Sequence, residues 1–204
     1  MITLFEIEFL GHICMSEISL RYMKAVWDKK IFLFNEKIFA NQACLLIEYT
    51  QSYCFYKVVI EYFNENAKSI PDIEYWVHLL NVTANDLIIK WCKVFGTDDN
   101  ELHWKKTSSS EHYEKTVRDL ILKNFAGDIE QWREYRKSVC DFRNTYSAHR
   151  NIENYREFPE LLPSFRVAES YFNFLVRAPV EWIEDHPLLG EYYNNHKEKI
   201  IKKL

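Results

Sequence analysis

The sequence predicts an all-α protein, folded as a single helical bundle of six or seven helices. The chain contains only 4 glycines and 5 prolines among its 204 residues, whereas an all-β protein needs turn residues roughly every 8 to 12 positions. Hydrophobic residues make up 48% of the chain and charged residues 27%, which is typical of a globular protein and excludes a disordered one. This length favours one domain over residues 1–204.

The charge and the cysteines of the chain indicate which partners and which cellular compartment to expect. The net charge is −4 and the sequence pI is about 6.0, so any nucleic-acid contact must come from a local basic patch. The 5 cysteines include no CxxC pair, which favours unpaired thiols in a reducing cytoplasm. The first basic residue is Arg21, unlike the start of a secretory signal. Charged residues interrupt every apolar window of membrane-spanning length.

The first half of the chain predicts two long helices. Residues 1–30 fit either a strand or a helix, and we favour helix there. Asn35 is a good N-cap for a helix over 36–64, whose apolar residues extend nearly all round. Such a helix is either central to a bundle or covered by a second subunit. A further helix runs from Pro71 to Phe95, with a break considered at 81–83, and Gly96 closes it.

The second half predicts shorter helices joined by polar segments. Residues 97–110 form a polar connector, and Ser108 with Glu111 resembles a capping box for a helix that ends at Gly127. Asp128 and Gln131 repeat this signal before a helix of about 20 residues. The remaining expectations are a loop over 151–162, a helix to Arg177, a short helix between Pro179 and Pro187, and a basic tail helix over about 188–204.

The helix that begins at Ile129 places arginines on its apolar side. At about 100° per residue, Arg136 and Arg143 fall inside the apolar stripe, and Arg150 joins them if the helix continues. Arginine is rarely buried unless it is paired. One interpretation is a structural salt bridge, for example to Glu48, or a side chain that reaches the surface. The other is a phosphate site, because the guanidinium fork matches phosphate geometry.

The end of this helix reads Arg143-Asn144-Thr145-Tyr146-Ser147-Ala148-His149-Arg150. It resembles the signature of the HEPN superfamily, in which an arginine and a following polar residue, often Asn, precede a histidine by four to six positions. The resemblance implies an HEPN-like helical bundle and a ribonuclease that needs neither metal nor cofactor. Many members act in toxin–antitoxin, abortive-infection or antiviral defence systems.

The resemblance also implies roles for particular residues. RNA cleavage through the 2′-hydroxyl leaves a 2′,3′-cyclic phosphate and needs a group that exchanges protons near neutral pH, as histidine does. A fixed positive charge must also stabilise the phosphate. His149 is therefore expected to be the acid–base, Arg143 the phosphate clamp and Asn144 the positioning residue. Additional phosphate or RNA contacts are expected from Arg136, Arg150 and Tyr146.

The partners expected are RNA, a second copy of the chain and an antitoxin protein. On a continuous helix Arg143 and His149 point about 120° apart, so either the chain turns back or two copies of the motif form a composite site in a homodimer, as is usual in the family. One alternative is an HEPN-like module that binds nucleotides, RNA or proteins without cutting. Another is an unrelated bundle with a chance motif. Cys92, His103 and His112 match no zinc spacing, so no metal site is expected.

Overall fold

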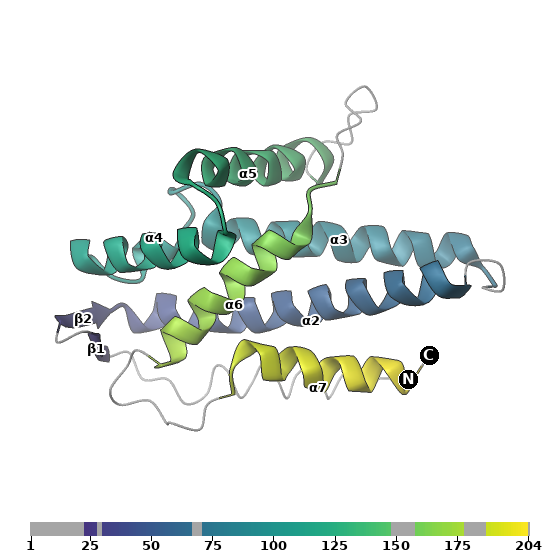
Figure 1. Cartoon of the computed structure of the whole chain (residues 1–204), viewed down its shortest axis with the longest axis horizontal. Coiled ribbons are helices and arrows are strands. Elements are labelled where there is room, and N and C mark those ends of the chain that lie inside the picture. Colours follow the sequence, from purple (N-terminus) through teal and green to yellow (C-terminus); the bar gives the residue numbers. More distant parts are fainter. Residues whose placement is uncertain (1–22, 28–29, 67–70, 148–157, 178–186, 204) are drawn as a thin grey trace.

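The computed structural model (Figure 1) describes residues 23–27, 30–66, 71–147, 158–177 and 187–203. Within these ranges the chain forms six α-helices, which confirms the predicted all-α bundle. A two-stranded hairpin precedes them, and two short segments of 3₁₀- and π-helix interrupt them. The elements are β1 (Met23–Trp27), β2 (Lys30–Phe34), α2 (Glu36–Asn66), α3 (Ile73–Phe95), η1 (Trp104–Lys106), α4 (Glu111–Phe125), α5 (Ile129–Phe142), η2 (Arg143–Ser147), α6 (Leu161–Arg177) and α7 (Leu189–Ile201).

Helix α2 is the central helix of the bundle. It packs along α3 and also contacts α6 and α7 (Figure 1), which accounts within one chain for its nearly all-round apolar surface. Its N-cap is Asn35 as predicted, since the Asn35 side chain accepts a hydrogen bond of 3.2 Å from the Ile38 amide. Helix α3 continues through 81–83 without a break, and the Thr83 hydroxyl donates to the Leu79 carbonyl within it.

The expectation of helix at the start of the chain is wrong for residues 23–27. Strand β1 pairs with β2 in antiparallel register, with Met23 opposite Phe34 and Trp27 opposite Lys30. The side chains of β2 alternate as a half-buried strand requires: Phe32 and Phe34 are fully buried, whereas Leu33 is 51% exposed. The two phenylalanines pack into the bundle core. This packing favours a strand in a region whose local sequence fits either a strand or a helix.

Most helix boundaries follow the predicted capping residues, with two corrections. Helix α4 is capped by Ser110 rather than Ser108, since the Ser110 hydroxyl accepts from the Tyr113 amide. Helix α4 ends at Phe125, slightly before the expected end at Gly127, and the left-handed residue that follows it is Ala126, with φ of 61°. The capping box of Asp128 and Gln131 is confirmed at the start of α5 by both reciprocal hydrogen bonds.

The C-terminal elements agree with the prediction where they are described. Helix α6 begins at Leu161, slightly earlier than expected, and holds Pro163 in its first turn, where a proline is tolerated. It ends at Arg177 as predicted, and α7 corresponds to the expected tail helix. The short helix expected between Pro179 and Pro187 and the segment 1–22 lie outside the described residues.

A buried polar network ties the centre of the bundle together. The Gln42 side chain of α2 donates to the carbonyls of Leu102 and His103, at 3.0 and 3.1 Å. Its oxygen accepts from the hydroxyls of Thr107 and Tyr171, at 2.8 and 2.7 Å. Tyr171 also shares a hydrogen bond of 2.8 Å with the Tyr113 hydroxyl. The network therefore joins α2, α4 and α6 to the 97–110 segment.

The cysteines depart from expectation at one position. Cys54, Cys92 and Cys140 are buried free thiols, as predicted. Cys44 is instead disulfide-bonded, which corrects the expectation that all the thiols are unpaired. Sequence spacing alone does not reveal which cysteines approach one another in space.

Candidate functional site

The apolar face of α5 brings the predicted motif against the bundle. Trp132, Val139, Cys140 and Phe142 are buried on this face, and the helix packs on α3. The expected helix of about 20 residues changes its hydrogen-bonding pattern after Phe142. There it continues as the π-helical turn η2, over Arg143–Ser147, which also packs on α3.

The π-helical turn begins at the first residue of the motif. Such turns are rare in proteins, and they occur frequently at functional sites because the wider turn redirects side chains from the α-helical pattern. The rotation of about 100° per residue therefore does not hold beyond Phe142. The sequence-based angle between Arg143 and His149 assumed a continuous α-helix, so it does not apply to this chain.

Arg143 is partly buried, and its guanidinium interacts with a neutral group. Its Nε and Nη2 atoms donate to the Asn144 side-chain oxygen at 3.1 and 3.0 Å. Among the ion pairs formed by the described residues, none involves Arg143. Asn144 itself is exposed. The positive charge therefore lies at the end of α5, beside an amide that holds its orientation, and acts through space on the Asp99 carboxyl.

The other predicted members of the site are only partly described. His149 and Arg150 lie outside the described residues, and of Tyr146 only the backbone in η2 is described. The structure therefore brings Arg143 and Asn144 together. The position of His149 relative to them stays a prediction.

Arg136, two turns before Arg143 on α5, has partners within the chain. Its Nη1 atom donates to the Gly96 carbonyl at 3.2 Å and pairs with Asp98 at 3.3 Å. The ion pair agrees with the interpretation that an arginine on the apolar face forms a structural salt bridge. Its partner is Asp98, however, and not Glu48 as suggested. Glu48 instead lies 3.7 Å from Lys90.

The sequence did not single out the charge cluster around Asp98. Besides Arg136, Asp98 contacts Lys105 at 2.5 Å and the fully buried His103 at 3.5 Å. Burial lowers the pKa of His103 to about 4, so this imidazole is neutral near pH 7. Because these residues meet only when the 97–106 segment folds against α5, the polar composition of that segment gave no specific signal.

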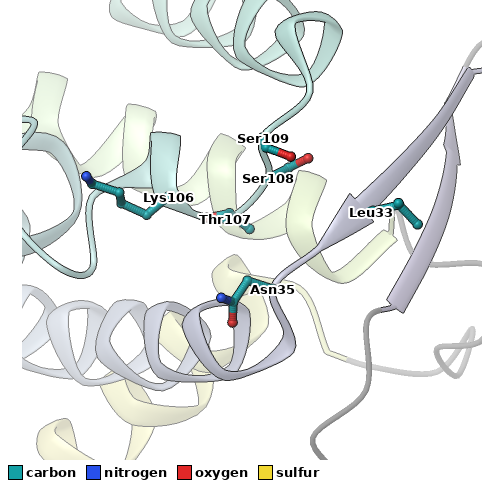
Figure 2. Close-up of a pocket in the computed structure, with 6 residues that line it drawn as sticks. All are labelled: Leu33, Asn35, Lys106, Thr107, Ser108 and Ser109. Atoms are coloured by element: carbon teal, nitrogen blue, oxygen red, sulfur yellow. The ribbon is translucent and has the colours of Figure 1, made fainter.

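The described residues also form a pocket of about 310 Å³ beside the hairpin. Figure 2 shows its lining, which comes from β2, the start of α2 and the segment before α4. The lining residues are Leu33, Asn35, Lys106, Thr107, Ser108 and Ser109. None of the described motif residues lines it, and three of its polar side chains are already engaged: Asn35 with the Ile38 amide, Thr107 with Gln42, and Ser108 with the Ser110 amide.

Comparison of the chain with protein-family models, curated proteins and solved structures gives no match. Across the described ranges, no group of three or more metal-ligating side chains is arranged to hold a metal ion. None of the described helices has both the length and the apolar character required to cross a membrane. The functional argument therefore rests on the Arg143 turn and its chemistry.

Proposed function

We propose that this protein is an HEPN-type endoribonuclease that cleaves RNA through the 2′-hydroxyl to a 2′,3′-cyclic phosphate. Arg143 binds the phosphate, Asn144 positions it, and His149 transfers protons. The observation that carries the proposal is the Arg143 guanidinium, whose hydrogen-bonding partner is the neutral Asn144 side chain. Its charge acts on the carboxyl of Asp99 only through space, without an ion pair between them in the described part of the chain.

The contrast with the other arginines of α5 supports this assignment. Arg133 lies 3.6 Å from Glu130, and Arg136 lies 3.3 Å from Asp98, so each has a carboxylate that balances its charge. An anion that approaches Arg143 breaks no ion pair of the described residues, although it must compete with the field of the Asp99 carboxylate. A guanidinium fork then offers two parallel hydrogen bonds to phosphate oxygens, which also fixes the orientation of the phosphate.

Asn144 supports the same function by orienting the guanidinium. Its oxygen receives both bonds from Arg143, which leaves the amide nitrogen of this exposed side chain facing away from that contact. A preorganised donor set is worth most when it stabilises charge that develops in the transition state. The Asn144 amide therefore serves as a second donor to the phosphate.

His149 completes the proposed reaction. As a general base it removes the proton from the 2′-hydroxyl, whose oxygen attacks the adjacent phosphorus while the 5′-oxygen leaves with a proton from an acid. In the homodimer that we propose, the second copy contributes its own motif to the composite site. We propose further RNA contacts from Arg136, Arg150 and Tyr146. A phosphate that binds Arg136 shares this guanidinium with Asp98 or replaces Asp98 as its partner.

The cellular setting is part of the same proposal. A ribonuclease of this type acts in the cytoplasm in prokaryotic defence or as a toxin, and an antitoxin protein holds it in check. The motif resemblance supports this part of the proposal.

The test is RNA cleavage by the purified protein in EDTA, with the ends of the products identified. We expect cyclic-phosphate ends, and a loss of at least about 100-fold in rate for Arg143→Ala or His149→Ala. Arg133→Ala is the matched control, since it removes an arginine from the same helix and should leave the rate unchanged. Equal cleavage by the wild-type protein and the Arg143→Ala variant would contradict the proposal.

Binding without cleavage has a separate signature. If the wild-type protein binds single-stranded RNA and Arg143→Ala weakens that binding, but no cyclic-phosphate product forms, the chain is a non-catalytic binding module. A loss of both binding and folding in Arg143→Ala would instead assign Arg143 a structural role.

A further inference from the structure

Two buried thiols meet where α5 packs on α3. The sulfur atoms of Cys92 and Cys140 lie 3.9 Å apart, within hydrogen-bonding distance for sulfur. Cys92 is fully buried near the end of α3, whereas Cys140 is 8% exposed in the last turn of α5. The two residues are 48 positions apart in the sequence, so this contact exists only in the folded chain.

The surroundings of the two thiols differ electrostatically. The hydrogen bond with Cys92 lowers the pKa of the Cys140 thiol, and the nearby Arg143 and Arg136 guanidinium groups lower it further. The same hydrogen bond and burial raise the pKa of Cys92. Cys140 therefore favours the thiolate, the nucleophilic form, while Cys92 remains a thiol beside it.

We propose that Cys92 and Cys140 form an oxidative modification site at which a hydroperoxide converts the two thiols into a disulfide between α3 and α5. The contact geometry carries this inference, because a disulfide needs a separation of about 2.05 Å and the sulfur atoms start only 3.9 Å apart. The proposal does not depend on ribonuclease activity.

The reaction proceeds in two balanced steps. The Cys140 thiolate attacks one oxygen of the hydroperoxide and the O–O bond breaks. The departing oxygen takes up the proton that Cys140 released to solvent on ionisation, so the products are a sulfenic acid and an alcohol, or water from hydrogen peroxide. The Cys92 sulfur then attacks the sulfenic sulfur. The S–S bond forms, the S–O bond breaks, and the hydroxyl leaves with the thiol proton as water. Two thiols are oxidised and one peroxide is reduced.

The bond would constrain the segment that carries Arg143. Cys140 lies three residues before Arg143, and η2 extends directly from the turn that holds Cys140. A disulfide that closes a long loop also stabilises the fold by restricting the unfolded chain. Oxidation should therefore raise the melting temperature, by roughly 5 to 10 °C for a chain of this size.

The test is peptide mapping of the wild-type protein before and after exposure to hydrogen peroxide, without reductant. Trypsin releases Cys92 in the peptide 91–93 and Cys140 in the peptide 138–143. We expect the two peptides to be recovered as one cross-linked species, together with the rise in melting temperature. Thiols that stay unmodified, or sulfinic and sulfonic acids at Cys140 in place of the cross-link, would overturn the proposal.

Two variants separate this chemistry from general oxidation. Cys54→Ser removes a buried free thiol of α2 and should leave the cross-link intact. Cys92→Ala removes the resolving thiol, so dimedone should trap the Cys140 sulfenic acid in this variant. A dimedone adduct on Cys54 but not on Cys140 would overturn the assignment of Cys140 as the reacting thiol. Both readouts are independent of RNA cleavage.

Discussion

The polar groups around Gln42 and the Arg143 turn show two ways in which this fold uses hydrogen bonds. Gln42 is fully buried, and its amide contacts two carbonyls and two hydroxyls from two other segments, 97–110 and α6. Arg143 lies at the end of a helix, and its guanidinium donates hydrogen bonds to the adjacent residue, Asn144. The polar groups of the first region are satisfied by hydrogen bonds within the chain, whereas the second keeps a guanidinium that forms no ion pair with the described residues and feels Asp99 only through space.

This difference separates stability from ligand binding. A buried amide with all its partners stabilises one arrangement of the bundle, because any change leaves several groups without hydrogen bonds. A guanidinium beside a neutral amide contributes little to folding and remains available to an anion. Four measurements test this contrast, beginning with the largest expected effect.

Replacement of Gln42 by leucine should give the largest loss of stability. Gln42→Leu removes four hydrogen bonds at once, although the Thr107 and Tyr171 hydroxyls still bond each other. The free energy of unfolding should therefore fall by roughly 2 to 4 kcal/mol. Urea denaturation measures the change. Gln51→Leu, on the same helix and only partly buried, is the matched control, and an equal loss there would contradict a special role for the network.

Acid should destabilise the protein through His103. Burial lowers the pKa of this residue to about 4, whereas an unfolded histidine titrates near about 6.5. The unfolded chain therefore binds the extra proton between these values. Stability should be complete above about pH 6.5 and fall by up to about 1.4 kcal/mol per unit as the pH drops towards 4.

The variant His103→Gln isolates this contribution. Urea denaturation at several pH values should show a shallower decline for His103→Gln than for the wild-type protein. His78→Gln, at an exposed position, should keep the wild-type slope. Identical slopes for the wild-type protein and His103→Gln would show that other groups cause the acid sensitivity.

Substitution by alanine should lower stability at Arg136 and leave it nearly unchanged at Arg143. Arg136→Ala removes the bond to Gly96 and the pair with Asp98, so the free energy of unfolding should fall by about 1 to 2 kcal/mol. Arg143→Ala should change it by less than about 0.5 kcal/mol while reducing RNA binding or cleavage. If Arg143→Ala proves the more destabilising of the two, the distinction between the two regions fails.

The smallest effect is expected at Arg133. Its pair with Glu130 is exposed, with side chains 67% and 69% accessible, and such pairs contribute about 0 to 1 kcal/mol. Arg133→Ala should therefore leave the melting temperature nearly unchanged. A measurable drop in melting temperature would show that an exposed charge on α5 contributes to stability even without a buried partner.

The sequence predicted the helical elements well where the capping residues were local. Asn35, Asp128 and Gln131 lie next to the backbone amides that they cap, so sequence spacing is sufficient to place them. The ends of α3 and α6 were also placed correctly, at Phe95 and Arg177. The choice of Ser108 over Ser110 failed because several serines adjoin and only the backbone geometry selects one.

The partners of charged groups were less predictable. The motif was found from the spacing of Arg143, Asn144 and His149, and the structure brings Arg143 and Asn144 into contact. The pairing of Arg136 with Asp98 and the approach of Cys92 to Cys140 both link segments about 40 or more residues apart. Such contacts depend on how α5 docks on α3 and on the 97–106 segment.

The sequence by itself determined the fold class, because a shortage of turn residues and the spacing of apolar and capping residues act locally along the chain. It also pointed to Arg143 as an arginine out of place on an apolar face. Only the tertiary structure decided which charges are neutralised inside the molecule, since ion pairs and thiol contacts form between distant segments. The π-helical turn η2, which carries Arg143 and packs against α3, is likewise a feature of the tertiary structure that the sequence did not predict.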